Sequence, residues 1–240
     1  MSEENAVEEI RRRLRELADE DHRQYTAKIV PNVPLEKIIG VRAANLQSMC
    51  KEINLNEELA FRADLPHEYH EENVLHAYLL ADFEEDDDYN LRLCMDGVEQ
   101  FLPYVDNWAV CDAIMPKVFS LHPKGLENKI LEWLRADRPY TVRFGLMVLM
   151  KNYLDEFFDE EHFQWVMDIS SNAHYVQMAQ AWYFATALSK RYEQTIPLLE
   201  NDMLDPTIHG LTIQKAVESR RIPYERKKYL RTLKRTDAKR

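Results

Sequence analysis

Three apolar stretches of the chain each contain side chains that could take part in chemistry. The first, NWAVCDAIM (107–115), places Trp108 and Asp112 four residues apart. Residues at this spacing lie on the same face of an α-helix. A carboxylate that is buried without a partner is costly. Asp112 must therefore be paired, capped or directed into a functional cleft.

The other two stretches each contribute one candidate side chain. Arg143 is the only charged residue in YTVRFGLMVLM (140–150), and Trp182 lies among small residues in AQAWYFATAL (179–188). Indole rings attract cations through the ring face, and the guanidinium group holds phosphate with a fork of N–H donors. A cleft that contained these side chains together with Trp108 and Asp112 would suit a cationic or phosphate-bearing ligand.

A purely structural interpretation of the same residues is the alternative. Asp112 and Arg143 would then form a buried ion pair that ties neighbouring helix pairs together. Trp108 and Trp182 would belong to the apolar core. Removal of Arg143 would cost stability if the pair is buried, and would weaken ligand binding if it faces an open cleft.

Composition and periodicity predict that these residues lie on helices of an all-α fold. The chain has only 5 glycines, and most of its 10 prolines stand between segments with helical apolar periodicity. Proline lacks the N–H group and disfavours helix in the residue before it, so it marks helix starts and breaks. We predict helices near 4–20, 21–30, 41–53, 56–63, 68–84, 90–103, 106–121, 124–136, 139–153, 159–171, 174–190, 192–200, 206–220 and 223–235.

The later predicted helices pair off with a repeat of roughly 35 residues, which is typical of stacked helical repeats. The pairs are 90–103 with 106–121, 124–136 with 139–153, and 159–171 with 174–190. We therefore expect one domain over residues 1–240, a superhelical stack of antiparallel helix pairs with one concave face. Asp112, Arg143 and Trp182 each fall on the second helix of a pair, and second helices line a common face.

Other sequence features exclude several classes of protein. No apolar run approaches the roughly 18 residues of a membrane span, and the charged N-terminus lacks the apolar region of a secretory signal. Cys50, Cys94 and Cys111 show no CxxC spacing, so we expect buried thiols in a reducing compartment. HEYHEE (67–72) is not the zinc motif H-E-x-x-H. We predict a cytoplasmic protein without membrane contact, metal or cofactor.

Charge is distributed unevenly along the chain. The net charge is −11, yet residues 214–240 hold 11 Lys+Arg against 3 Asp+Glu. The remainder therefore carries a net charge of −19, which by itself opposes nucleic acid binding. Such asymmetry indicates a basic C-terminal element on an acidic body.

The chain resembles the DNA alkylation repair family of HEAT-like alkylpurine DNA glycosylases. Six stretches carry the resemblance, in order and across most of the chain. They are KIIGVRAANLQSMCKEI (37–53), HEYHEENVLHAYLL (67–80), FLPYVDNWAVCDAI (101–114), RPYTVRFGLMVL (138–149), YVQMAQAW (175–182) and IQKAVESRRI (213–222).

The resemblance implies a fold of HEAT-like repeats and an active site. The family has an essential Asp, a Trp one turn before it, an Arg on the next repeat and a second Trp further on. These correspond to Asp112, Trp108, Arg143 and Trp182. The implied activity is hydrolysis of the N-glycosidic bond of N3- and N7-alkylated purines in duplex DNA, without flipping the base. Asp112 would stabilise the oxocarbenium ion, the tryptophans would pack against the sugar and backbone, and Arg143 would hold a phosphate.

The expected partner is double-stranded DNA with alkylated purines, bound by a monomer. Because DNA affinity rests mainly on phosphate neutralisation, basic residues must gather on the binding face. The candidates are Lys37, Arg42, Lys151, Lys190, Arg191, Lys215, Arg220 and Arg221. The alternative function is a non-enzymatic helical-repeat module that binds DNA or a protein.

Overall fold

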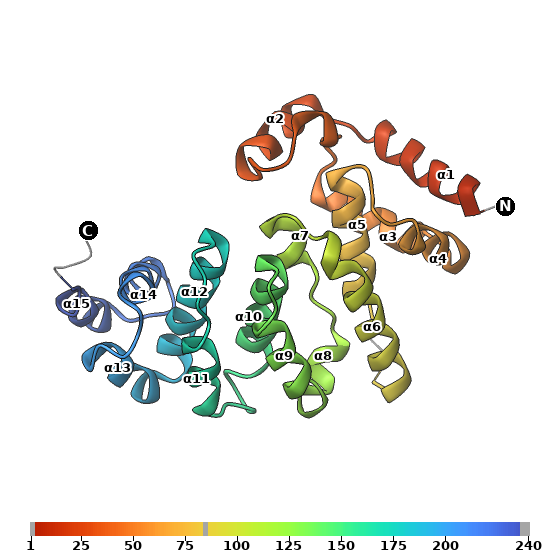
Figure 1. Ribbon diagram of the computed structural model, residues 1–240. Helices are drawn as coiled ribbons and strands as arrows, with labels where there is room; N and C mark the ends of the chain where they lie inside the picture. Colours follow the sequence, from red (N-terminus) through yellow and green to blue (C-terminus); the bar gives the residue numbers. More distant parts are fainter. Residues whose placement is uncertain (1–2, 84–85, 236–240) are drawn as a thin grey trace. The chain divides into compact units, whose positions relative to one another are not determined.

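A computed structural model of the chain describes residues 3–83 and 86–235 (Figure 1). Over these residues the chain forms α-helices and short 3-10 helices and contains no β-strand. The prediction of an all-α fold is therefore confirmed. The α-helices are α1 (Glu3–Glu16), α2 (Glu20–Ile29), α3 (Ala43–Glu52), α4 (Leu55–Ala63), α5 (His70–Ala81), α6 (Asp88–Phe101), α7 (Trp108–Ala113), α8 (Val118–Leu121), α9 (Glu127–Leu134), α10 (Pro139–Asn152), α11 (Glu161–Met167), α12 (His174–Lys190), α13 (Tyr192–Glu200), α14 (Pro206–Glu218) and α15 (Tyr224–Thr232). The 3-10 helices are η1 (Leu35–Lys37), η2 (Leu102–Tyr104) and η3 (Pro123–Gly125).

Contacts along the chain divide it into two compact units. Unit 1 comprises Met1–His122 and holds α1 to α8, and unit 2 comprises Pro123–Arg240 and holds α9 to α15. Each unit buries its own apolar side chains. The single domain over residues 1–240, the superhelical stack of HEAT-like repeats and its concave face stay predictions.

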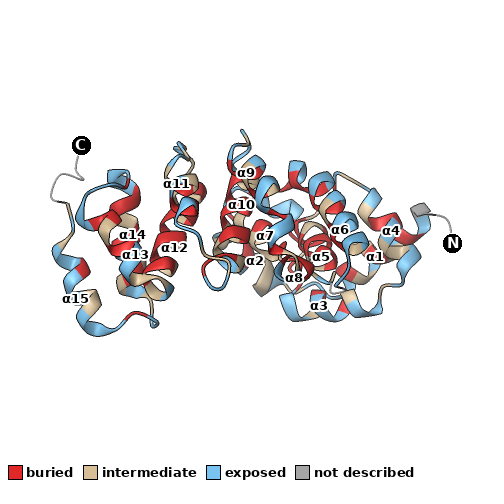
Figure 2. Ribbon diagram, turned by 90° about the horizontal axis from the view of Figure 1, so that it is seen from below, coloured by how far each residue is buried: buried red, intermediate tan, exposed pale blue. Residues whose placement is uncertain are grey.

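Helix α5 is the centre of unit 1. It packs against α3, α4, α6 and α7, while α1 packs against α4. Figure 2 shows α5 largely buried, and Leu75 and Leu80 on this helix are shielded completely from solvent. Because α5 packs against α7, it also positions Trp108 and Asp112.

The predicted helix 106–121 is wrong as a single element. Helix α7 ends at Ala113, and the chain becomes helical again only at α8. Pro116 stands in the gap, and a proline disfavours helix in the residue before it and supplies no N–H of its own. The other predicted helices agree with the structure to within about four residues at each end.

Unit 2 contains a continuous layer of three helices, the second members of successive pairs. Helix α10 packs against α12, and α12 packs against α14, while α9 packs against α10 and α13 against α12 (Figure 1). We predicted that Arg143 and Trp182 lie on second helices that form one layer. Within unit 2 they lie on α10 and α12, which pack against each other. We call α10, α12 and α14 the second-helix layer.

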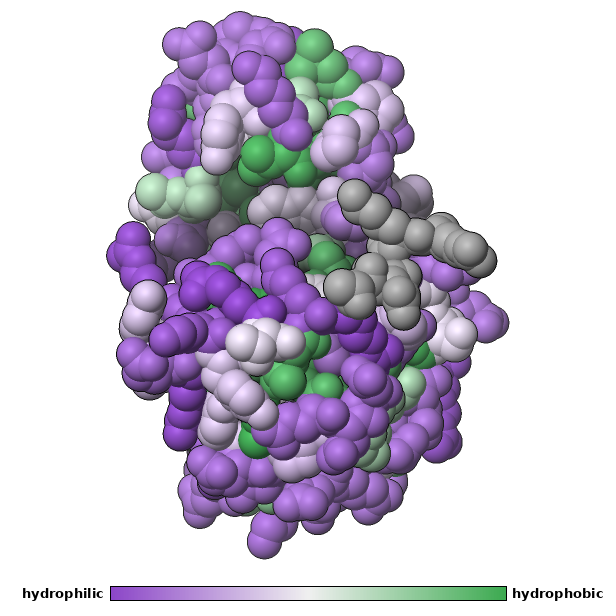
Figure 3. Space-filling view, turned by 90° about the vertical axis from the view of Figure 1, so that its left-hand side faces the viewer, coloured by the Kyte–Doolittle hydropathy of each residue, from purple (hydrophilic) through white to green (hydrophobic). Residues whose placement is uncertain are grey.

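The surface of unit 2 on the side of α13, α14 and α15 is mostly hydrophilic, with hydrophobic residues in separate small patches (Figure 3). The large exposed hydrophobic side chains of this region include Met203, Tyr224 and Tyr229. Among the described residues, no helix combines the length and the apolar character needed to cross a membrane.

Candidate functional site

A side-chain cap fixes the short helix that carries Trp108 and Asp112. Asn107 Oδ1 accepts the N–H groups of Ala109 at 3.0 Å and Val110 at 3.1 Å. The Asn107 side chain is buried, and its Nδ2 donates to Asp106 Oδ1 at 2.8 Å. A helix of six residues is not stable alone, so this cap and the contact with α5 determine its direction.

Trp108 anchors the start of α7 to the segment after α2. Its Nε1–H donates to the carbonyl oxygen of Ile29 at 2.8 Å. The half-buried indole packs against a small cluster of Val30, Val33 and Ile38. Trp108 is therefore held by one polar and several apolar contacts, with part of the ring left exposed.

Asp112 lies one turn after Trp108 on the same short helix. It is partly exposed, whereas its neighbour Cys111 is fully shielded from solvent. The spacing of the two candidates on one helix face is thus as predicted.

Arg143 and Trp182 are in direct contact within unit 2. The guanidinium carbon lies 5.4 Å from the centre of the Trp182 ring, a cation–π arrangement. Arg143 Nη1 also donates to the carbonyl oxygen of Tyr175, in the first turn of α12, at 2.8 Å. Arg143 is only 2% exposed, so a phosphate reaches it only if neighbouring side chains move.

A groove of about 460 Å³ crosses the second-helix layer beside Trp182. Three predicted DNA-binding residues, Trp182, Lys215 and Arg221, line it. Lys215 Nζ lies 3.0 Å from a Glu218 carboxylate oxygen, which leaves the lining with a net positive charge. An indole wall with two cations suits a sugar-phosphate chain. The remaining lining residues are Met150, Ala185, Thr186, Ser189, Glu218 and Ser219.

Lys190 and Arg191 lie elsewhere in unit 2 and hold a loop. Lys190 pairs with the Asp155 carboxylate. Arg191 donates Nε to the Leu154 carbonyl oxygen at 3.1 Å and lies 5.1 Å over the Phe158 ring. Both cations thus fasten the acidic segment after α10. To bind phosphate as predicted, Lys190 and Arg191 would have to contact DNA in addition to these groups of the loop.

The other basic candidates are all exposed. Arg42 precedes α3 and pairs with Asp19 at 2.7 Å, while Lys37 lines a cavity of about 180 Å³ with His67 and His70. Lys151 lies in the last turn of α10, and Arg220 precedes Arg221 in the loop after α14. Lys215 and Arg221 share a groove with Trp182, one of the four central candidates.

Sequence analysis missed the role of Glu71 in HEYHEE. Its carboxylate accepts the N–H groups of Ile39 at 2.8 Å, Gly40 at 2.7 Å and Val41 at 3.3 Å. Gly40 has φ +97°, and a Cβ there would lie 2.4 Å from the Asp19 carbonyl oxygen. Glu71 of HEYHEE therefore holds the KIIG segment (37–40) against the start of α5 by hydrogen bonds. The signals of this contact in the sequence are a glutamate at the start of an apolar helix and an isolated glycine.

Glu72 forms a second set of buried hydrogen bonds in unit 1. This buried carboxylate accepts Arg11 Nε at 2.7 Å, the N–H of Glu68 at 2.9 Å and that of Tyr69 at 2.8 Å. It joins α1 to the start of α5. Neither glutamate is free to act on a substrate, so the motif is structural.

His67 of this motif and His76, further along α5, are packed together as neutral rings. His67 Nε2 lies 2.8 Å from His76 Nδ1, and the rings stack on Phe61 and Phe101. Burial lowers the pKa of His67 to about 4 and that of His76 to about 2. In the part of the chain that the structure describes, no group of three or more metal-ligating side chains is placed to hold an ion.

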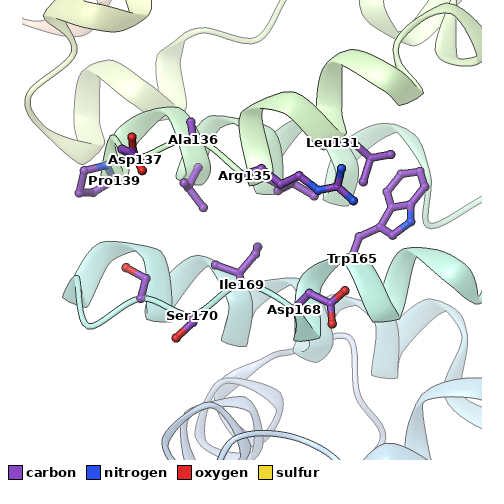
Figure 4. A pocket seen from close by; sticks show the side chains of 12 residues that line it. Leu131, Arg135, Ala136, Asp137, Pro139, Trp165, Asp168, Ile169 and Ser170 are labelled. Carbon is purple, nitrogen blue, oxygen red and sulfur yellow. The ribbon is translucent and has the colours of Figure 1, made fainter.

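A second groove in unit 2, of about 400 Å³, contains none of the sequence candidates. Arg135, Trp165 and Asp168 gather at one end of it, and Asp137 and Ser170 lie toward the other (Figure 4). The loops after α9 and α11 form its walls. The juxtaposition of these loops was not predictable from spacing within either segment.

The prediction of buried thiols holds for Cys94 and Cys111 but only in part for Cys50. Cys94 and Cys111 are buried and Cys50 is partly exposed, and none of the three forms a disulfide. Burial raises the pKa of Cys50 and of Cys94 to about 12. These thiols are consequently poor nucleophiles.

Comparison with known proteins gives one family match. The family model described as "DNA alkylation repair enzyme" matches residues 10–209. This segment contains all four central candidates, Trp108, Asp112, Arg143 and Trp182. No curated protein matches the chain.

Proposed function

The chain belongs to the family of DNA alkylation repair enzymes, and on this basis we propose that it is a DNA glycosylase for alkylated purines. The substrate is duplex DNA that carries an N3- or N7-alkylated purine. The reaction is hydrolysis of the N-glycosidic bond, without flipping the base into a pocket. The product is the free base, and the DNA strand stays intact for later steps of base excision repair.

Asp112 is the proposed catalytic residue. An N-alkylated purine already carries a positive charge, so it leaves without a general acid. The sugar then develops oxocarbenium character, which a nearby carboxylate stabilises. Asp112 also positions the attacking water. One carboxylate is sufficient, consistent with the absence from the sequence of an acid pair spaced as in sugar hydrolases.

The tryptophans and the arginine position the DNA in this proposal. Trp108 and Trp182 pack against sugar and backbone with the exposed parts of their rings. Arg143 supplies positive charge for a phosphate next to the lesion. Since Arg143 is buried beneath Trp182, it also holds that ring in place, and Lys215 and Arg221 make the accessible phosphate contacts.

The observation that carries the proposal is the geometry of α7. A capped helix holds a partly exposed carboxylate one turn after an anchored tryptophan, inside the segment that matches the repair family. The groove beside Trp182 adds a surface suited to a DNA backbone.

The decisive experiment compares base release by the wild type and Asp112→Asn. Duplex DNA methylated at N3 of adenine and N7 of guanine is incubated with each protein, and the released bases are separated and counted. We expect release by the wild type and a loss of at least about 100-fold in Asp112→Asn. Asp96→Asn, on the exposed face of α6, makes the same charge change and should release bases as the wild type does.

Two results would contradict the proposal. Equal release by Asp112→Asn and the wild type would exclude Asp112 as the catalytic residue. Absence of release by the folded wild type would exclude the glycosylase. The alternative of a non-enzymatic repeat module that binds DNA or a protein would then be favoured.

A further inference from the structure

The end of unit 2 carries a concentration of positive charge beyond the family match. Residues 219–235 contain eight Lys+Arg and a single acidic residue, Glu225, and the family model ends at residue 209. The rest of the chain is strongly acidic. This segment is therefore an electrostatic feature that the family match does not account for.

Two of these cations are used inside unit 2. Arg226 lies 3.8 Å over the Tyr192 ring and 3.7 Å from Glu193, and Arg235 pairs with Asp202. Leu230, which is fully buried, packs α15 against α14, and Arg226 links α15 to α13. These contacts therefore set which face of α15 is turned toward the rest of unit 2.

Three of the six remaining cations lie with Tyr224 in a stripe on the solvent side of this segment. Tyr224, Lys228 and Arg231 follow at steps of four and three residues, so they share one face of α15. Tyr224 is 71% exposed, and Lys228, Arg231 and the following Lys234 are exposed as well. None of these three cations forms an ion pair with another described residue. We call these four residues the C-terminal stripe.

The stripe continues from the groove beside Trp182. Arg221 lines that groove and precedes Tyr224 by three residues, so their Cα atoms are at most about 11 Å apart. From Tyr224 to Arg231 the helix rises about 10 Å. A DNA strand places a phosphate every ~3.4 Å along the helix axis, so the stripe matches several successive phosphates.

We propose that the C-terminal stripe binds the phosphate backbone of double-stranded DNA outside the segment held by the groove. Lysine and arginine neutralise phosphates, and the tyrosine hydroxyl donates to a phosphate oxygen. This inference rests on the proposed function only in taking DNA as the ligand, and it requires no catalysis.

The test measures binding to undamaged duplex DNA as a function of salt concentration. The variant is the full chain with Lys228→Gln, Arg231→Gln and Lys234→Gln. We expect weaker binding and a slope of log affinity against log salt that is smaller by about 3, roughly one per lost phosphate contact. The matched control is Lys28→Gln, Lys51→Gln and Lys124→Gln, which removes three exposed lysines outside the stripe.

Equal salt slopes in the stripe variant and the control would overturn the inference. Thermal melts show whether both variants remain folded. Base release separates this inference from the proposed function. If both hold, the stripe variant needs more DNA for half-maximal release but keeps the maximal rate. If the stripe variant shows the smaller salt slope yet the wild type releases no base, only the glycosylase fails.

Discussion

The two units hold their candidate residues by different means. In unit 1, α7 and the loop before α3 are fixed by single buried polar side chains, Asn107 and Glu71, which accept backbone N–H groups. In unit 2, three long helices pack through apolar side chains, with Arg143 as the one buried charge among them in the described core. The stability of a segment held by one buried polar side chain depends on that residue, whereas an apolar helix layer is stabilised by contacts among many side chains. Single substitutions should therefore reveal the difference.

Glu71→Ala should have the largest effect, because it removes three accepted hydrogen bonds at once. The donors of Ile39, Gly40 and Val41 would be left without their acceptor, two of them in buried residues. We expect the free energy of unfolding to fall by about 4 kcal/mol. Urea denaturation measures it. Glu68→Ala, on an exposed neighbour, should change it by less than about 0.5 kcal/mol. If Glu71→Ala and Glu68→Ala lowered the free energy of unfolding equally, unit 1 would not depend on the single buried side chain of Glu71.

Arg143→Ala tests whether unit 2 also depends on one polar residue. It opens a cavity and leaves the Tyr175 carbonyl oxygen without this donor, so we expect a loss of about 3 kcal/mol. Arg143→Met keeps most of the volume and should lose only about half as much. If both variants lose the same amount in urea denaturation, the polar contacts of Arg143 dominate and unit 2 resembles unit 1. A negligible loss with weaker DNA binding would instead support an open cleft.

The sequence predicted the fold class and the long helices because their information is local. Apolar periodicity predicted both ends of α12 and α13 without error. The four-residue spacing of Trp108 and Asp112 correctly predicted that both lie on one face of a helix. The break at Pro116 was also a local signal, which the prediction overlooked.

What the sequence left out depends on contacts between distant segments. Glu71 meets Gly40 across 31 residues, and Trp108 meets Ile29 across 79. No periodicity within either segment encodes such a meeting. The burial of Arg143 beneath Trp182 is of the same kind, because it depends on how α12 packs on α10. Residue types indicated candidates for chemistry, and tertiary packing decided which of them remain accessible.

The contribution of buried His67 to the acid sensitivity of unit 1 should be smaller than the loss expected for either Glu71→Ala or Arg143→Ala. The His67 pKa falls from its usual 6.5 to about 4 in the folded chain, so between these values the unfolded chain binds more protons. Stability is therefore full above pH 6.5 and declines as the pH falls toward 4. For His67 alone the loss at pH 5 is about 2 kcal/mol.

The measurement is urea denaturation at pH 7 and pH 5, with the wild type and His67→Gln. The variant lacks one titrating group, so its loss between the two pH values should be about 2 kcal/mol smaller. His174→Gln, an exposed residue at the start of α12, should keep the full loss. Burial also lowers the pKa of His162 in unit 2, so hydrogen exchange at pH 5 must show which unit opens first. If unit 2 opened first at pH 5, unit 2 and not unit 1 would be the more acid-sensitive part of the protein. The buried histidines of unit 1 would then not determine where acid unfolding begins.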